Sequence, residues 1–343
     1  MSKISKQLFL AFTFVAVLGS CSKTLIGTEK SNTATSNFNV LWQDFDEHYA
    51  AFIPKKVDWQ AQYLKHRMQV TDTMSNVSLY AVLTGLLDVL DDNHIYLRPL
   101  KETGLPWYSG GILGRTKVED YDRRVAETYL KEKIVYNKAL EYGFIEGNIG
   151  YINLRNEEED ISVYYKAMDV ILEKLKNTKG IIIELRENDG GEDRVSQYIA
   201  NRFATQKHLS FSSRLKNGPG HADFAAPLDF FTEPEGSFQY TRPVIILTNL
   251  NVFSSGETFV LAMLQNSNVE MVGGITGGAL SDAVERELPN GWAYRLPIAD
   301  VRDAHGKNLE GVGITPHVTV TNTREDLQSG RDKVMEKAIQ LLK

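Results

Sequence analysis

Apolar runs and helical periodicities alternate along the C-terminal part of this 343-residue chain. Short continuous runs rich in β-branched residues predict buried strands, because a strand that is covered on both faces loses its polar alternation. Such strands are predicted at residues 149–154, 180–186 and 244–247. Apolar residues at helical spacing predict helices at 163–175, 195–203 and 257–265. This alternation of strand and helix predicts an α/β fold with a mainly parallel sheet over residues 149–343.

Residues 38–98 show helical spacing and predict a small helical N-terminal subdomain. Its third helix carries a wide apolar face over residues 78–90, and a strand begins at 95–97. A connecting segment, 99–148, follows, and a helix is expected within it at 123–142. Farther along, we expect a long loop or an excursion from the core over 209–239, a hairpin around Asn290-Gly291 and a terminal helix at 326–342.

The first 21 residues have the pattern of a secretory signal. Lys3 and Lys6 precede an apolar run at 8–17 that is too short to span a bilayer. The single cysteine, Cys21, directly follows Leu-Gly-Ser, which resembles a bacterial lipobox, whose cysteine is lipidated. A simple signal peptide or an N-terminal anchor is the alternative. Residues 22–37 are polar and aperiodic and predict a flexible tether.

The charge and composition exclude some classes of function. The net charge is −6, and no basic stripe interleaved with aromatic residues occurs, so nothing indicates binding to nucleic acid. The seven histidines are scattered and form no metal-ligand pattern, so neither a metal nor another cofactor is expected.

The segment 242–279 contains the first candidate for chemistry, Ser254, between a predicted strand and a predicted helix. Backbone N–H groups at the start of a helix are unpaired and stabilise an anion there. A serine that attacks a carbonyl creates such an anion, and the N–H of Ser255 follows directly. The alternative is structural, because Ser254 and Glu257 also match a helix capping box.

A second turn, at Gly190 and Gly191, also follows a predicted strand. Ligands of parallel α/β sheets bind beyond the carboxyl ends of the strands, so both turns lie where a site is expected. Glycine lets the backbone approach a ligand closely, although a plain strand-to-helix turn explains the pair equally well. His94, beside Asp91 and Asp92, is one candidate base, and a histidine at a helix end is its structural alternative.

Five motifs in register resemble the serine peptidases that include the C-terminal processing (tail-specific) proteases and the tricorn protease core. In order they are LDDNHIYL, GIIIELRENDGG, PVIILTNLNVFSSGETF, VGGITGGALSDA and LEGVGITPHV. The resemblance implies a crotonase/ClpP-like core, with Ser254 as nucleophile, His94 as base and Glu310 completing the relay. It also implies an oxyanion hole formed by the N–H of Ser255 and by a glycine of the Gly190-Gly191 motif.

The chain departs from that family in several places. The C-terminal processing branch uses a lysine base after the nucleophile helix, and residues 273–281 contain no lysine, which favours the tricorn-like histidine relay. Asn93 stands where the tricorn protease has a serine, and His317 stands where an aspartate is usual. Too few residues lie between His94 and Gly150 for the PDZ domain that many relatives carry.

Taken together, the peptidase motifs and the lipobox-like signal predict an exported serine peptidase, anchored by lipid to a bacterial membrane and facing the periplasm or the cell surface. Its substrates would be peptides or unfolded proteins, and a histidine base would lose activity below about pH 6.5. An inactive lipoprotein that binds peptides or a partner protein in the same groove is the alternative. A crotonase-like activity on acyl thioesters ranks last, because nothing indicates a pocket for a nucleotide carrier.

Overall fold

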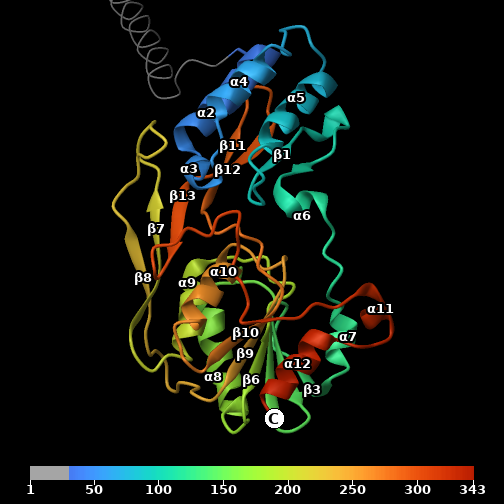
Figure 1. Ribbon diagram of the computed structural model, residues 1–343, viewed down its shortest axis with the longest axis vertical. Coiled ribbons are helices and arrows are strands. Elements are labelled where there is room, and N and C mark those ends of the chain that lie inside the picture. The colour runs from blue at the N-terminus through green and yellow to red at the C-terminus, as the bar shows by residue number, and fades with distance from the viewer. Residues whose placement is uncertain (1–30) are drawn as a thin grey trace, which may run out of the picture.

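The computed structural model describes residues 31–343 and has an elongated shape (Figure 1). The predicted signal, Cys21 and residues 22–30 of the predicted tether lie outside the described residues. Helices from the N-terminal third gather at one end of the molecule, and a large sheet with its own helices forms the other end. Between residues 31 and 343, no helix is both long and apolar enough to cross a bilayer.

The N-terminal body contains four helices. Their apolar faces, including Phe38, Phe45 and Leu83, are fully buried against one another and against a small sheet. The helices are α2 (Ala34–His48), α3 (Phe52–Lys55), α4 (Trp59–Arg67) and α5 (Asn76–Asp88).

Helix α2 begins four residues earlier than expected, within the predicted tether. Thr33 caps it, because the Thr33 hydroxyl accepts a hydrogen bond from the N–H of Ser36 at 3.1 Å. Asn37 is buried, and its side-chain oxygen accepts from the N–H of Asn290 at 2.9 Å. The prediction of a tether through residue 37 is therefore wrong for 34–37. The polar residue Thr33 supplies a helix cap here rather than part of a flexible tether.

The small sheet joins segments from both halves of the chain. Its order is β11-β12-β1-β2, and Tyr96 of β1 pairs with Arg295 of β12. The expected hairpin at Asn290-Gly291 is confirmed, with Gly291 at a φ of 82°. This hairpin leaves the predicted C-terminal core and packs in the N-terminal body. The strands are β1 (Tyr96–Arg98), β2 (Tyr108–Ser109), β11 (Ala283–Glu287) and β12 (Ala293–Pro297).

The large sheet has the order β14-β10-β9-β6-β5-β4-β3. The five strands from β14 to β5 run parallel, so the prediction of an α/β fold with a mainly parallel sheet is confirmed. These strands are β5 (Ile149–Leu154), β6 (Ile181–Glu184), β9 (Val244–Thr248), β10 (Val269–Gly273) and β14 (Val318–Thr319).

The prediction of a helix at 123–142 is wrong. Only α7 (Arg123–Glu127) is helical, and β3 (Leu130–Val135) and β4 (Leu140–Ile145) follow as an antiparallel pair. Gly143 favours this pairing, because a Cβ there would lie 2.0 Å from the carbonyl oxygen of Glu132. The connecting segment 99–148 thus contributes two strands to the large sheet. Its remaining elements are η1 (Lys101–Thr103), α6 (Gly111–Arg115) and β2 of the small sheet.

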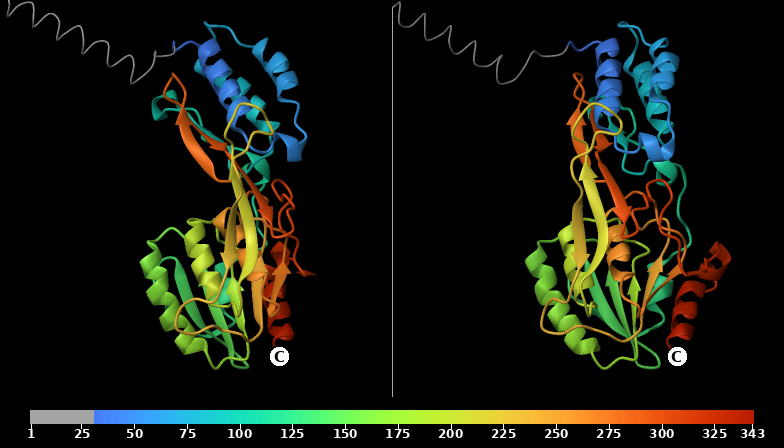
Figure 2. Two further views of the ribbon diagram at one scale, coloured as in Figure 1. Left: turned by 90° about the vertical axis from the view of Figure 1, so that its left-hand side faces the viewer. Right: turned by 60° about the vertical axis from the view of Figure 1, so that its left-hand side comes forward.

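Helices cover both faces of the large sheet (Figures 1 and 2). On one face lie α8 (Ile161–Leu175), α9 (Asp193–Asn201) and α10 (Ser255–Met263), and on the other lies α12 (Lys333–Leu341). The helices predicted at 163–175, 195–203 and 257–265 are thereby confirmed as α8, α9 and α10. The expected terminal helix is interrupted, because α11 (Arg324–Gln328) ends before Gly330, whose φ is 78°.

Residues 209–239 are not the expected long loop. They form most of the hairpin of β7 (His208–Leu215) and β8 (Leu228–Thr232), which pairs with β13 (Ala299–Asp303) in a third sheet. The hairpin runs from the large sheet to the helical body, as Figure 2 shows. Near its tip His221 lies 3.0 Å from a carboxylate oxygen of Asp46. The alternation of the two strands was hidden by the glycines and prolines at the tip.

Candidate active site

Ser254 lies in the turn between β9 and α10 with a left-handed backbone. Its φ is 57° and its ψ is −133°, a combination that costs a non-glycine residue about 1–3 kcal/mol. The surrounding structure holds it there, because α10 is buried and the N–H of Ser254 donates to the carbonyl of Ala279 at 2.7 Å. Strain of this kind concentrates at sites where function requires a particular geometry.

Ser254 does not cap α10 through its hydroxyl, which makes no capping bond within the described chain. The Glu257 carboxylate binds elsewhere, accepting from the hydroxyl of Thr276 and from the N–H groups of Gly278 and Ala279. The capping box that the sequence left open is therefore absent. The Ser254 residue instead lines a cavity of about 530 Å³, together with Gly191, Ser255, Asp282 and Arg295.

Two backbone donors beside Ser254 are free. The N–H groups of Ser255 and Gly191 have no hydrogen-bond partner between residues 31 and 343. The N–H of Gly190, in contrast, donates to Oδ1 of Asn188 at 2.8 Å. Of the two glycines expected to supply an oxyanion donor, Gly191 thus has the available group.

Gly190 contributes in a different way, by allowing the turn at 188–191 to approach the Ser254 turn closely. A Cβ at this position would lie 2.7 Å from Cβ of Ser254 and 2.9 Å from the nitrogen of Ser255. Its φ of 96° also favours glycine. The turn at 188–191 can therefore lie directly against the serine turn only because residue 190 has no side chain.

His94 lies in the turn between α5 and β1 and is buried. Its N–H donates to Oδ1 of Asp92 at 2.9 Å, and its ring packs edge-on against Phe253 with 6.1 Å between ring centroids. Neither ring nitrogen bonds to Ser254 or to any other described residue. The imidazole thus lies beside the residue that precedes Ser254, but no hydrogen bond links it to the serine.

Burial lowers the pKa of His94 to about 4, although Asp92 acts in the opposite direction. The positive charges of Arg295 and Lys55 lower this pKa further. The imidazole is therefore neutral at pH 7, which is the state that a general base needs. The acid limit of activity expected from an unperturbed histidine, about pH 6.5, moves toward pH 4.

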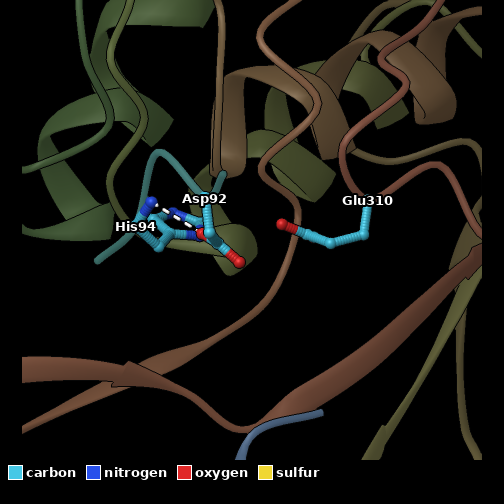
Figure 3. A group of neighbouring side chains, drawn as sticks. All are labelled: Asp92, His94 and Glu310. Atoms are coloured by element: carbon cyan, nitrogen blue, oxygen red, sulfur yellow. Dashed lines mark hydrogen bonds between the residues drawn. The ribbon is translucent and has the colours of Figure 1, made fainter. Parts of the chain in front are cut away.

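Glu310 is buried close to His94. Its Oε2 accepts from the N–H groups of Leu280 and Ser281 at 2.9 and 3.1 Å, while Oε1 has no partner among residues 31–343. Burial first, and then the charge of Asp92, raise its pKa well above the ordinary range. Side-chain atoms of Asp92, His94 and Glu310 lie within 4.8 Å of one another, and Figure 3 shows Glu310 extending toward the other two.

The loop 276–281 connects the serine to Glu310. Ala279 accepts from Ser254, Leu280 donates to Glu310, and Gly278 accepts from Gly311 at 2.7 Å. The structure thus brings the predicted histidine and glutamate together and ties the glutamate to the serine turn through one loop.

Asp92 and its partners are not among the site residues predicted from the sequence. Oδ2 of Asp92 accepts from the hydroxyl of Tyr49 at 2.7 Å and lies 3.7 Å from Nζ of Lys55. Asn93 has a structural role, donating to the carbonyl of Gly277 and accepting from the N–H of Leu113. Helical spacing places Tyr49 on an apolar face, and nothing in that spacing indicates a contact with residue 92.

No metal-ligand pattern is visible along the sequence, yet folding brings one group of suitable side chains together. Asp92, His94 and Glu310 are the residues within 31–343 whose donor atoms lie close enough to hold an ion. The group mixes one imidazole with two carboxylates, all buried.

Residues 148–320 match the model of peptidase family S41. The chain is 25% identical over 206 residues to the carboxy-terminal processing protease CtpA of Bacillus subtilis, covering 60% of this chain and 41% of that protein. A crystal structure assigned as a peptidase from Parabacteroides merdae is similar, with a TM-score of 0.83, 30% identity and coverage of 91% of this chain and 97% of that one.

Mature CPAF in complex with lactacystin shares the fold at 12% identity, with a TM-score of 0.69 and coverage of 90% of this chain and 98% of that one. The chain spans less than half the length of the curated relatives that it matches first.

Proposed function

The chain belongs to peptidase family S41, and on that premise we propose that it hydrolyses peptide bonds by acyl transfer to Ser254. The observation that carries this proposal is the serine turn itself. Ser254 is held in a strained backbone beside two unpaired N–H groups, at the edge of a cavity. Such donors stabilise the oxyanion that forms when a serine attacks a carbonyl, and removing one costs about 3–4 kcal/mol of barrier.

In the proposed mechanism His94 takes the proton of the Ser254 hydroxyl as its oxygen attacks the peptide carbonyl. The N–H groups of Ser255 and Gly191 hold the tetrahedral oxygen. His94 then protonates the leaving amine, and Glu310 fixes the imidazole and stabilises its charge. Water attacks the resulting acyl-serine with His94 again as base. Catalytic hydrogen bonds often tighten only when substrate is bound, so an unpartnered imidazole in the free protein is compatible with this mechanism.

The substrates that we propose are peptides or unfolded proteins, which fit an open cavity beside the serine. We further propose that the protein is exported and lipidated at Cys21, which places it on a bacterial membrane facing the periplasm or cell surface. The lipobox-like sequence before Cys21 supports this. A Cys21→Ala variant should move from the membrane to the soluble fraction, and persistence in the membrane would refute the anchor.

Replacement of Ser254 by alanine tests the reaction. Peptide hydrolysis should fall by about 10³-fold or more, because the nucleophile is removed. Labelling by a serine-reactive phosphonate, followed by mass spectrometry, should modify the unaltered chain at residue 254 and leave Ser254→Ala unmodified. Hydrolysis by Ser254→Ala at the unaltered rate would exclude this nucleophile.

Ser255→Ala is the matched control. It keeps the backbone N–H of residue 255 and removes only a hydroxyl that donates to the carbonyl of Gly191 at 2.7 Å. The variant should still be labelled at Ser254, although more slowly, because Gly191 is held less firmly. Loss of labelling in Ser255→Ala but not in Ser254→Ala would show that Ser255, and not Ser254, is the nucleophile.

A binding protein that retains the peptidase fold is the second candidate. The observation that favours it is the absence of a hydrogen bond from His94 to Ser254 within the described chain. A folded sample that binds peptide, is inert to the phosphonate and hydrolyses nothing would support this function over catalysis.

A further inference from the structure

Asp92, His94 and Glu310 form a cluster that the proposed relay does not fully explain. All three side chains are buried, and their donor atoms lie within 4.8 Å of one another. Figure 3 shows the Glu310 carboxylate directed toward the side on which Asp92 and His94 lie. A serine relay needs one carboxylate behind the imidazole. Asp92 is a second carboxylate, which the relay does not use and which lies close to the same imidazole.

Three polar atoms of this cluster are buried without partners. They are both ring nitrogens of His94 and Oε1 of Glu310, none of which bonds to any residue from 31 to 343. Buried polar atoms without partners are costly, and most proteins satisfy them. A bond between His94 and Glu310 would satisfy only one ring nitrogen and one oxygen. A cation would likewise bond one ring nitrogen and Oε1 of Glu310, but it would also engage the Asp92 carboxylate, which the direct bond leaves out.

We propose that Asp92, His94 and Glu310 bind Zn²⁺, and that the bound ion reversibly inhibits the peptidase. Zinc takes imidazole nitrogen and carboxylate oxygen at about 2.0–2.2 Å, commonly through three protein ligands with a fourth position open. Tetrahedral ligands at that distance lie about 3.4 Å apart, so donor atoms that now lie within 4.8 Å of one another must approach by at most about 1.4 Å. Magnesium and calcium prefer oxygen ligands, so the imidazole disfavours them.

The surroundings leave one oxygen of Asp92 for the metal. Oδ2 accepts from Tyr49 and lies 3.7 Å from the ammonium of Lys55. Among residues 31–343, Oδ1 accepts only from the N–H of His94, and a carboxylate oxygen can accept more than one bond. The positive charge of Lys55 opposes the dication. Lys55 therefore weakens zinc binding, and the affinity for zinc depends on residue 55.

Inhibition follows from the His94 ring nitrogen that zinc occupies. A metal on the ring nitrogen that faces Glu310 leaves the ring proton on the other nitrogen, so that nitrogen has no lone pair with which to accept the proton of Ser254. The metal also holds the Glu310 oxygen that would orient the ring. This part rests on the proposed function, whereas zinc binding itself does not.

Calorimetric titration of the Ser254→Ala protein with zinc chloride, after removal of metals by chelator, tests the site without any activity. One zinc ion should bind per chain. Asp92→Asn, made in the same background, should weaken binding by about tenfold or more, since a neutral amide is a poor zinc ligand. Lys55→Gln should tighten binding because it removes the opposing charge.

Asp91→Asn is the matched control. Asp91 is the exposed neighbour of Asp92, pairs with Arg115 and lies outside the cluster. Its variant should bind zinc as the parent does. Zinc binding that is absent at about 0.1 mM metal, or equal in Asp92→Asn and Asp91→Asn, would overturn the proposal. Anomalous scattering from zinc-soaked crystals of the unaltered chain guards against misfolded variants, and a zinc peak away from the three residues would also overturn it.

Peptide hydrolysis by the unaltered chain should stop with zinc and return with chelator, while magnesium has no effect. Zinc binding without any peptide hydrolysis would support the proposed metal site and refute the proposed peptidase function. Hydrolysis that is indifferent to zinc, in a chain that binds none, would refute the metal site alone.

Discussion

Gly190 sets how closely the two turns of the site can approach. Gly190→Ala would place a methyl carbon 2.7 Å from Cβ of Ser254 and require a left-handed alanine. We predict that peptide hydrolysis falls by about 100-fold or more, because a displacement of 1 Å at the reacting serine is enough for that loss. The free energy of unfolding should fall by about 2–4 kcal/mol.

Gly147→Ala is the control that adds the backbone strain of a left-handed alanine without a steric clash at its Cβ. Gly147 has a φ of 87°, close to that of Gly190, but no heavy atom lies within 4 Å of its ideal Cβ among the described residues. This variant should lose about 1 kcal/mol of stability and keep full activity. Steady-state kinetics and denaturant unfolding of both variants check the comparison, and equal activities would show that the contact at Gly190 is unimportant.

At the scale of single residues, sequence resemblance could place Ser254, His94 and Glu310 in one site, and the roles remain predictions. It could not show which glycine N–H is free. That depends on Asn188, whose side chain folds back onto Gly190. Nor could it show the buried state of His94, since desolvation depends on packing from several elements, and this changes the expected pH limit.

Helix α10 holds the loop 276–279 through one buried carboxylate. Glu257 accepts three hydrogen bonds from this loop, and the loop in turn accepts the N–H of Ser254 through Ala279. We predict that Glu257→Gln lowers the free energy of unfolding by about 1–3 kcal/mol, because the amide NH₂ must face a donor. Hydrolysis should fall as well, since the serine turn loses its support.

Glu336→Gln serves as the control for that substitution. Glu336 lies on α12 and accepts hydrogen bonds from Arg331 and Tyr129, on the opposite face of the large sheet from α10. Its activity should be unchanged and its stability nearly so. Thermal unfolding and steady-state kinetics of both variants provide the measurement. A Glu257→Gln protein with unaltered kinetics would mean that the loop is held by other contacts.

At the scale of elements, long apolar periods were predicted well and short polar strands were not. The helices at 163–175, 195–203 and 257–265 matched α8, α9 and α10 because each has a continuous buried face. Strand β3 has only half-buried and exposed residues, so its alternation was weak and a helix was predicted instead. Sheet pairing with β4, a tertiary contact, overrode the local pattern.

The whole molecule should lose stability as pH rises above neutrality. Burial raises the pKa of Glu157 to about 8 and that of Glu257 to about 7, from ordinary values of 4.5. The folded chain therefore holds protons that the unfolded chain has released, so stability is greatest below pH 4.5 for these groups and is lost through pH 7–8. His94 acts oppositely, but only below its unfolded pKa of 6.5.

Between pH 6.5 and 8.5 the loss for Glu157 alone should be about 2 kcal/mol. Denaturant unfolding at the two pH values measures it, and Glu157→Gln should remove this part of the slope, since a glutamine has no proton to lose. A free energy of unfolding that is flat or rising over this window would show that Glu157 has an ordinary pKa.

The division of the whole chain into domains was only partly predictable. A helical N-terminal body and a parallel core were both expected, but the hairpin 283–297 crosses from one to the other. Its alternation revealed two strands without revealing their partner. Pairing across nearly two hundred positions leaves no local pattern in a single sequence.

That shared sheet has a consequence for synthesis. The ribosome delivers Tyr96 and its neighbours long before it delivers Arg295, the residue opposite Tyr96. Until then the buried faces of α2 and α5 lack the strands that cover them. Closure of the N-terminal body must therefore follow translation of most of the chain, and an isolated fragment ending before β11 should aggregate when expressed alone.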